Sequence, residues 1–256
     1  MSVTKRPMPV GTKLEATVTL ASSSLFGVET PNGTKTVEDV RSVIEHRRVE
    51  ILEVDREGEA HKIGVHYEEK KEARINNGRE RRKTSPVAGK SYLVEWVDQR
   101  PSVTDPNGAA VPRNEAMVVE GAFRDLGNPS AFTQAIPGGP LAVGTPIPAL
   151  AEALKEEMRR GFEGRVFFGK VSVTPQGIRD ANGTSGLAFA VALQVGLVQE
   201  DGKVRMDLHG VLVVKGDSAW PLLLDVSGPV AVDGTVDGAA VHGKGTARLT
   251  VAHAYP

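Results

Sequence analysis

The chain has 256 residues, with 31 lysines and arginines against 32 aspartates and glutamates, and it has no cysteine. This charge balance creates no overall field that would attract nucleic acid. The absence of cysteine excludes disulfides, thiolate metal sites and cysteine nucleophiles. The length suits one large β-rich domain or two small ones.

The N-terminal segment, residues 1–12, carries Lys5 and Arg6 but no apolar run of the length that a secretory signal needs. We therefore expect a tether before the first strand, and no later segment is apolar for long enough to form a membrane span. If a signal peptide was removed from the natural chain, an exported, periplasmic or outer-membrane-associated location is favoured. Otherwise the expected location is the cytoplasm.

Most of the chain alternates between apolar and polar residues with a period of two, which is typical of half-buried strands. Residues 40–54 fit both a helical stripe and a strand face, and we favour one long strand. Asn-Gly, Asp-Gly and Glu-Gly pairs between the alternating runs predict tight turns. The clearest alternating runs are residues 13–20, 61–67, 166–173, 187–199, 203–214 and 246–253.

The central region is rich in proline. Residues 101–148 hold eight of the 16 prolines in the chain. Proline disfavours both helix interiors and central strands. The sequence therefore predicts long loops around short edge strands in this region.

Residues 148–161 have the pattern of one amphipathic helix. Leu150, Leu154 and Met158 recur every four residues with charged residues between them, and Gly161 stands at the end. We expect these three side chains, together with Phe162, to be buried against the sheet, where they line the core or a ligand cavity.

The order of strands and turns after this helix echoes the order before it. The expected organisation is one β-rich domain over residues 13–256, and the echo offers two duplicated meander halves, 13–147 and 163–256, joined by the helix. The spacings differ between the halves, however, so the general sameness of β-meanders is the favoured explanation of the echo.

Residues 238–246 resemble a phosphate-binding P-loop, because Gly238, Gly243 and Lys244 stand at the required spacing. A P-loop needs a helix immediately after it, whose N-terminus holds the phosphates. Here residues 246–253 alternate as a strand does. We therefore predict a Gly-rich hairpin with Gly238 and Gly243 in or beside turns, and no nucleotide binding.

The other motifs fail to assemble a catalytic or metal site. Gly216-Asp217-Ser218 resembles the nucleophile motif of one hydrolase family, but it runs into an apolar strand and has no partner base. His61 and His66 are five apart in a strand, which places them on opposite faces, so they cannot hold one metal ion. We expect no catalytic residue, no metal ligand and no cofactor.

Residues 70–83 form the most basic stretch of the chain and surround a predicted hairpin tip at 76–78. One interpretation is an edge hairpin that its charges protect from aggregation. The other is contact with an anionic surface such as lipid head groups or an acidic polymer. No aromatic residues are interleaved for base stacking, so nucleic acid is not expected. The basic residues are Lys70, Lys71, Arg74, Arg79, Arg81, Arg82 and Lys83.

One resemblance rests on the Pro-rich centre with its GTPIP, the single helix, and the closing segment SGPVAVDGTVDGAAVHGKGTARL at 227–249. In this pattern the chain resembles bacterial exported or lipoprotein-type β-rich domains. It is similar in architecture to the open half-barrels of lipoprotein carriers. The resemblance implies a curved antiparallel sheet wrapped over a helix, with a hydrophobic cavity between them.

These observations predict a mainly β fold, an antiparallel curved sheet in a half-barrel or sandwich, with one amphipathic helix packed on it. The function they favour is a non-catalytic cell-envelope binding or scaffold protein that covers an apolar ligand or a partner segment. Its partner would be a hydrophobic ligand or another envelope protein. The alternatives are an assembly subunit that associates through its sheet edges, and an enzyme whose site is built from scattered residues.

Overall fold

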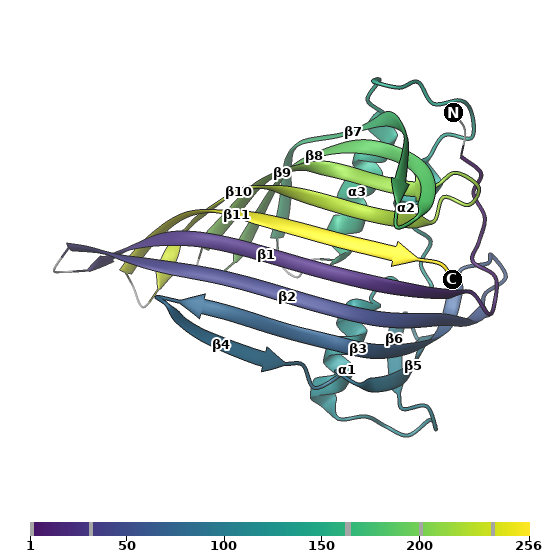
Figure 1. The fold of residues 1–256 in the computed structure, drawn as a ribbon, viewed down its shortest axis with the longest axis horizontal. Coiled ribbons are helices and arrows are strands. Elements are labelled where there is room, and N and C mark those ends of the chain that lie inside the picture. Colours follow the sequence, from purple (N-terminus) through teal and green to yellow (C-terminus); the bar gives the residue numbers. More distant parts are fainter. Residues whose placement is uncertain (1–2, 31–32, 162–164, 200–201, 237–238) are drawn as a thin grey trace.

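The computed structural model describes residues 3–30, 33–161, 165–199, 202–236 and 239–256. In these residues, 11 strands form one open, curved, antiparallel sheet, and three helices lie on one of its faces (Figure 1). This confirms the mainly β fold with a curved antiparallel sheet. None of the helices described here is long and apolar enough to cross a membrane.

The strands are long, and they contain all of the runs that the sequence predicts as strands. Residues 40–54, which also fitted a helix, belong to a strand. The strands of the N-terminal half are β1 (Lys13–Thr30), β2 (Gly33–Val54), β3 (Ala60–Asn76), β4 (Arg79–Thr84), β5 (Lys90–Val97) and β6 (Arg100–Thr104). Those of the C-terminal half are β7 (Arg165–Ala181), β8 (Thr184–Gln199), β9 (Gly202–Lys215), β10 (Pro221–Val236) and β11 (Ala239–Ala254).

The first and last strands join the two halves into one sheet. The order across the sheet is β6-β5-β3-β2-β1-β11-β10-β9-β8-β7, and β4 pairs with β3 off this path. β1 and β11 pair antiparallel from Glu15–Ala254 to Val28–Val241. Figure 1 shows the paired ends of β1 and β2 and the β3–β4 turn extending beyond the helices. We call this end of the sheet the distal end.

The helices are α1 (Arg113–Ala122), α2 (Ala131–Ala135) and α3 (Pro148–Gly161). α3 has the predicted bounds, but the expectation of a single helix, with only loops and edge strands over residues 101–148, is wrong. α1 follows Pro112 at its N-cap, and the side chain of Ser130 caps α2 by accepting from the Thr133 amide. Prolines stand outside these helix interiors, where they do not interrupt helical hydrogen bonds.

We call the sheet face that carries the helices the inner face. Under α1, Val119 packs in a core with Tyr67, Val94 and other inner residues of β2, β3, β5 and β6. Under α3, Leu150 packs in a second core with Phe189 and its neighbours. Leu150 and Phe189 are both 0% exposed. The burial of these apolar side chains is the main force that holds the helices on the sheet.

Polar contacts fix the positions of the helices. The carboxylate of Glu115 on α1 accepts hydrogen bonds from the Tyr92 hydroxyl at 2.6 Å and the Lys90 ammonium at 2.7 Å. The carboxylate of Glu157 on α3 accepts from the Ser130 hydroxyl at 2.5 Å and the Phe132 amide at 3.0 Å. Glu157 therefore ties the beginning of α2 to α3.

The N-terminal segment packs along the β9–β10 turn, where the sequence suggests only a tether. Val3 is 5% exposed and belongs to the core under α3. The amide of Thr4 donates to the Gly216 carbonyl at 2.9 Å, and the Trp220 indole donates to the Arg6 carbonyl at 2.8 Å. This segment is therefore part of the folded domain.

Glycines inside the strands allow close approach between neighbouring strands. A Cβ atom at Gly210 in β9 would lie 1.9 Å from the carbonyl oxygen of Asp225. At Gly228 in β10 it would lie 1.9 Å from the carbonyl oxygen of Asp207. Any other residue at these two positions would force the neighbouring strands to shift, and such glycines are typical of sheets that bend sharply.

The prediction that Gly243 lies in or beside a turn is wrong. Gly243 is inside β11, directly opposite Phe26 of β1. A Cβ atom at Gly243 would lie 2.4 Å from the Phe26 ring, so the ring covers the glycine. An aromatic side chain that covers a strand glycine in this way restores the packing that the glycine lacks. Gly238, the other predicted turn glycine, lies outside the described residues.

Candidate ligand-binding site

The inner face of β7 to β10 is predominantly apolar. Residues directly opposed in neighbouring strands share a face of the sheet. At the level of the β3–β4 tip, Phe168 pairs with Val195, Val195 with Met206, and Met206 with Val230. Charged and polar residues of the same strands, such as Lys203 of β9, alternate onto the outer face.

The distal part of this surface is not completely covered. Its side chains are half-buried, whereas those under α3 are mostly buried. A hollow of ≈ 650 Å³ at the same level takes most of its lining from the outer face, including Phe167, Gln194, Arg205 and Lys244, so it is not part of this inner surface. We call the half-buried inner-face residues of this region the apolar trough. They are Val166, Phe168, Leu197, Val204, Met206, Val230 and Val232.

The apolar side chains of α3 that were predicted to face the sheet differ in how deeply they are buried. Leu150 lies in the core, whereas Leu154 and Met158 are half-buried against Leu193 and its neighbours. Phe162 lies outside the described residues. The apolar side of α3 therefore covers less of the inner face toward the distal end.

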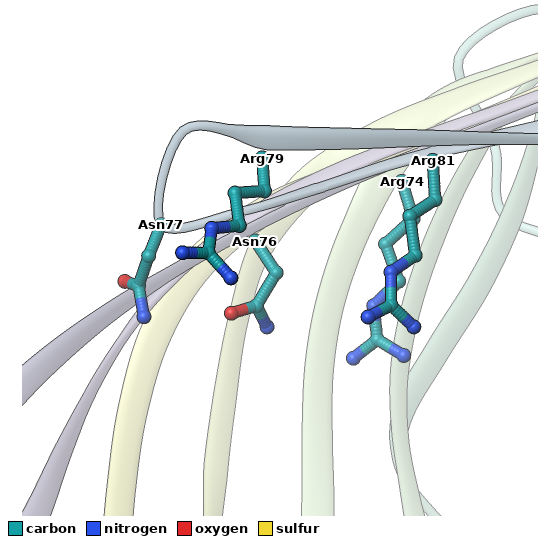
Figure 2. A pocket seen from close by; sticks show the side chains of 5 residues that line it. All are labelled: Arg74, Asn76, Asn77, Arg79 and Arg81. Atoms are coloured by element: carbon teal, nitrogen blue, oxygen red, sulfur yellow. The ribbon is translucent and has the colours of Figure 1, made fainter.

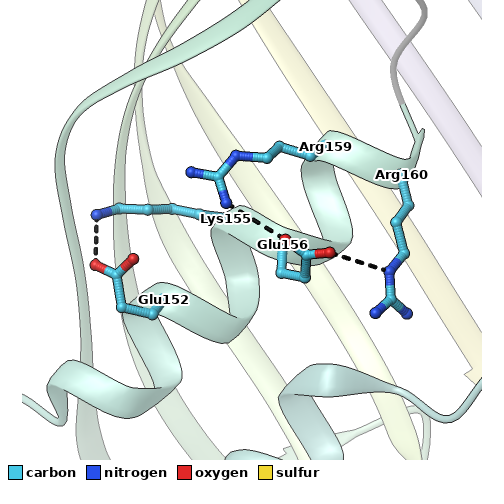
Figure 3. A network of polar contacts seen from close by, with 5 residues as sticks. All are labelled: Glu152, Lys155, Glu156, Arg159 and Arg160. Atoms are coloured by element: carbon cyan, nitrogen blue, oxygen red, sulfur yellow. Dashed lines mark hydrogen bonds and ion pairs between the residues drawn. The ribbon is translucent and has the colours of Figure 1, made fainter.

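The opposite side of α3 is polar. Lys155 pairs with Glu152 at 2.6 Å, and Glu156 pairs with Arg159 at 3.4 Å and Arg160 at 3.5 Å (Figure 3). The guanidinium of Arg159 also lies over the Phe168 ring, 5.2 Å from its centroid. Such contacts are typical of cation–π pairs. The end of α3 thus reaches the edge of the trough.

The seven basic residues of 70–83 divide between the two faces of the β3–β4 hairpin. Cross-strand pairing places Lys70 beside Glu45 and Arg74 opposite Arg41, on the inner face. Residues next to them along the strand point outward. The inner-face group is Lys70, Arg74, Arg79, Arg81 and Lys83, and the outer-face group is Lys71 and Arg82.

The inner-face group is only partly neutralised. Lys70 pairs with Glu45 at 2.5 Å, and Arg74 pairs with Asp39 at 2.5 Å. In the part of the chain that the structure describes, Arg79, Arg81 and Lys83 have no ion pair. On the outer face, Lys71 and Arg82 both have acidic partners. The uncompensated positive charge of the hairpin therefore faces inward.

Three arginines line a second hollow at the hairpin tip. This hollow measures ≈ 590 Å³ and is lined by Arg74, Asn76, Asn77, Arg79 and Arg81. Figure 2 shows their side chains extending from the same side of the β3–β4 ribbon. Arg74 and Arg81 are directly opposed across the ladder. Like charges in that position repel one another unless an anion lies between them.

A buried polar cluster lies on the inner face between the two cores. Arg47 donates to Glu45 at 2.7 Å, and Tyr67 and His253 belong to the same cross-strand row as Arg47. Three buried atoms have no hydrogen-bond partner among the described residues, namely Nε of Arg47, the hydroxyl of Tyr67 and Nδ1 of His253. We call Glu45, Arg47, Tyr67, Lys70 and His253 the central polar cluster.

Burial shifts the ionisation of this cluster. It raises the pKa of Tyr67 to about 12, and it lowers the pKa of His253 to about 4, with the nearby Arg47 charge adding to the second effect. Both side chains are therefore neutral near pH 7. The sequence contains a signal for this cluster, because Glu45 and Arg47 interrupt the apolar alternation of Val43 and Val49 on one strand face.

Two pairs of hydroxyl and imidazole groups lie on the outer face. Ser91 and His66 are 2.9 Å apart, and Thr17 and His46 are 3.1 Å apart. Both pairs stand within paired strands, where the ladder already uses the backbone amides that an oxyanion would need. Among the described residues no group of three or more His, Asp or Glu side chains is placed to hold a metal ion.

No family model and no curated protein sequence matches the chain. Solved structures with a similar arrangement of strands include one of lipovitellin, from work on its lipid–protein interactions. It is 7% identical to this chain with a TM-score of 0.38, and the match covers 94% of this chain and 25% of the lipovitellin chain. The chain thus spans about a quarter of the lipovitellin chain.

Two further structures are outer-membrane or translocator proteins. An outer membrane channel from Pseudomonas putida F1 has 7% identity and a TM-score of 0.25, with 97% of each chain covered. The translocator domain of an autotransporter from Neisseria meningitidis has 8% identity and a TM-score of 0.20, covering 97% of this chain and 89% of that one. Similarity at these levels concerns strand arrangement and says nothing of function.

Proposed function

We propose that the protein is a non-catalytic binding protein of the cell envelope that holds an apolar ligand in the trough on its inner face. The observation that carries this proposal is the half-buried apolar trough at the distal end, where the inner face extends beyond the helices. Concave apolar surfaces of this kind are typical of ligand sites in soluble proteins. The envelope as compartment follows the resemblance to exported domains.

The trough differs from a core in how its apolar side chains are covered. Leu193 and Val195 of β8 are 5% and 2% exposed. In contrast, Met206 and Val230 are half-buried although they occupy the same face. Covering this surface with a ligand would remove more apolar area from water, at about 25 cal/mol for each Å².

The edges of the sheet disfavour the alternative role as an assembly subunit. Edge strand β4 is exposed along its length and has the charged sequence RERRKT. Edge strand β7 contains Pro175, and its register shifts between Phe168 and Val171 and again between Pro175 and Gly177. Charges, prolines and bulges are the features that prevent strand addition at sheet edges. A ligand on the inner face is therefore the better supported function.

Fluorescence titration with N-phenyl-naphthylamine, an uncharged apolar probe, tests this proposal. We expect saturable binding to the parent protein. Met206→Glu should weaken it about tenfold or more, since a carboxylate in an apolar site is costly to desolvate. Lys203→Glu is the matched control, because it places the same side chain on the outer face of the same strand.

The control should bind the probe as the parent does, and circular dichroism should show that both variants remain folded. The proposal is wrong if the folded parent shows no saturable binding. It is also wrong if Met206→Glu and Lys203→Glu bind the probe equally well.

A further inference from the structure

The arginine hollow at the β3–β4 tip is not explained by a purely apolar ligand. It brings Arg74, Arg79 and Arg81 together, and only Arg74 has an acidic partner among the described residues. Charges that only protect an edge strand from aggregation work equally well on the inner and the outer face of the hairpin. Here the unpaired ones point to the inner face, whereas Lys71 and Arg82 on the outer face are paired.

The hollow and the apolar trough lie on the same face of the sheet, at the same level along the strands. A single cross-strand row runs from the arginine hollow into the trough, and directly opposed residues in such a row share a face. Its members, in order across the sheet, are Arg79, Asn76, Asp39, Ser24, Gly245, Val230, Met206, Val195 and Phe168. The row begins with Arg79 and Asn76, passes Asp39, which is paired with Arg74, and the small residues Ser24 and Gly245, and ends apolar.

The residues in the middle of this row and of its neighbour are small. Ser24 and Gly245 stand in the middle of this row, and Ser22 and Ala247 stand at the corresponding positions of the next inner-face row. Neighbouring strands are about 4.8 Å apart, so β3 and β10, four strand spacings apart, are separated by about 19 Å along the sheet. A molecule that occupies both regions must therefore be elongated.

We propose that the ligand of the trough is an anionic lipid whose phosphate head binds Arg74, Arg79 and Arg81 while its acyl chain lies in the trough. This inference rests on the proposed function and names its ligand class. The planar guanidinium fork matches phosphate oxygens, and a phosphate offers several acceptors at once. A carboxylate offers two oxygens and one negative charge, whereas a phosphate offers more oxygens and up to two charges, so three arginines and two asparagines around one hollow suit the phosphate better.

Binding measurements with three probes test the inference. The probes are a long-chain lysophosphatidic acid, the monoacylglycerol with the same chain but no phosphate, and glycerol phosphate with no chain. We expect the parent protein to bind the lysophosphatidic acid about tenfold more tightly than the monoacylglycerol, and glycerol phosphate far more weakly than either. Added salt should reduce the preference for the phosphate lipid.

A pair of double variants locates the head group. Arg79→Ala with Arg81→Ala should remove the preference for the phosphate lipid and leave monoacylglycerol binding unchanged. Lys71→Ala with Arg82→Ala removes the same charge from the outer face of the same hairpin, so it should keep the preference. All four residues are exposed, and we expect thermal unfolding to show that both variants are folded.

The possible failures are distinguishable. Equal affinity of the parent for both lipids overturns the head-group inference and leaves the proposed function intact, whereas no binding of either lipid overturns both. If both double variants lose the preference for the phosphate lipid equally, the attraction is nonspecific and the inference is wrong. It is also wrong if glycerol phosphate binds as tightly as the lysophosphatidic acid. If the parent is dimeric and only the inner-face variant is monomeric, the surface receives a second copy and the lipid inference is wrong.

Discussion

Arg47 and His253 stand on either side of Ala16 in one cross-strand row of the inner face, and each has a buried nitrogen without a hydrogen-bond partner among the described residues. The guanidinium of Arg47 is permanently charged. The imidazole of His253 is therefore held in its neutral form by burial and by a neighbouring positive charge. Protonating it in the folded protein would place two positive charges in a poorly solvated position.

This relationship predicts that stability falls with decreasing pH between about 6.5 and about 4. In that window the unfolded chain protonates His253 while the folded protein, with a His253 pKa of about 4, does not, so acid favours unfolding. The loss attributable to this one group should reach about 3 kcal/mol at the acid end. Urea unfolding of the parent and of His253→Leu at a series of pH values measures it.

The leucine variant should depend less on pH than the parent in this window. Identical slopes for the two proteins would show that His253 titrates equally in the folded and unfolded states.

Glu115 should affect stability at a lower pH. Its carboxylate accepts from Lys90 and Tyr92, and these hydrogen bonds hold its pKa below the usual range. A lowered pKa means that the stabilisation is complete above the unfolded pKa and is lost as the pH falls through the folded pKa. We expect Glu115→Gln to be less stable than the parent at pH 7 and similar to it in strong acid. A constant difference at all pH values would contradict this role of the charge.

The packing of α3 can be tested along its stripe. Leu150 is 0% exposed in the core with Phe189, so Leu150→Ala should lower the free energy of unfolding by about 2 to 5 kcal/mol. Leu154→Ala should cost less, because Leu154 is only half-buried. Lys155 is half-buried, but its ammonium pairs with the exposed Glu152, so Lys155→Ala should cost less than either leucine variant, about 1 kcal/mol or less. Equal urea midpoints for all three variants would mean that α3 does not pack on the sheet.

Close strand approach makes Gly210 sensitive to substitution. A Cβ atom there would overlap the Asp225 carbonyl, so Gly210→Ala should destabilise the protein by about 1 to 3 kcal/mol. Gly216, in the turn between β9 and β10, has no atom within 4 Å of an added Cβ, so Gly216→Ala is the matched control. Thermal unfolding of the two variants compares them directly. Unfolding of Gly210→Ala at the parental temperature would show that the strands can separate without loss.

Sequence alone determined the strands, because alternation with a period of two is a local property of residues such as those of 13–20 and 203–214. The stripe of Leu150, Leu154 and Met158 determined α3 for the same reason. The α1 segment, RNEAMVVEGAF after Pro112, also contains a helix pattern, but the dense prolines around it favour loops, so the local sequence does not decide between the two.

Only the tertiary structure decided which residues meet. The pairing of β1 with β11 joins segments more than 200 residues apart, and no local pattern specifies such a partner. That pairing places the Phe26 ring over Gly243. Gly243 therefore lies inside a strand, where the sequence predicted a turn. It also connects the basic inner face of β3 and β4 to the apolar face of β7 to β10. The seven basic residues of 70–83 were visible as a group, but their division into an unpaired inner set and a paired outer set depends on strand register and long-range contacts, which act only once the sheet has formed.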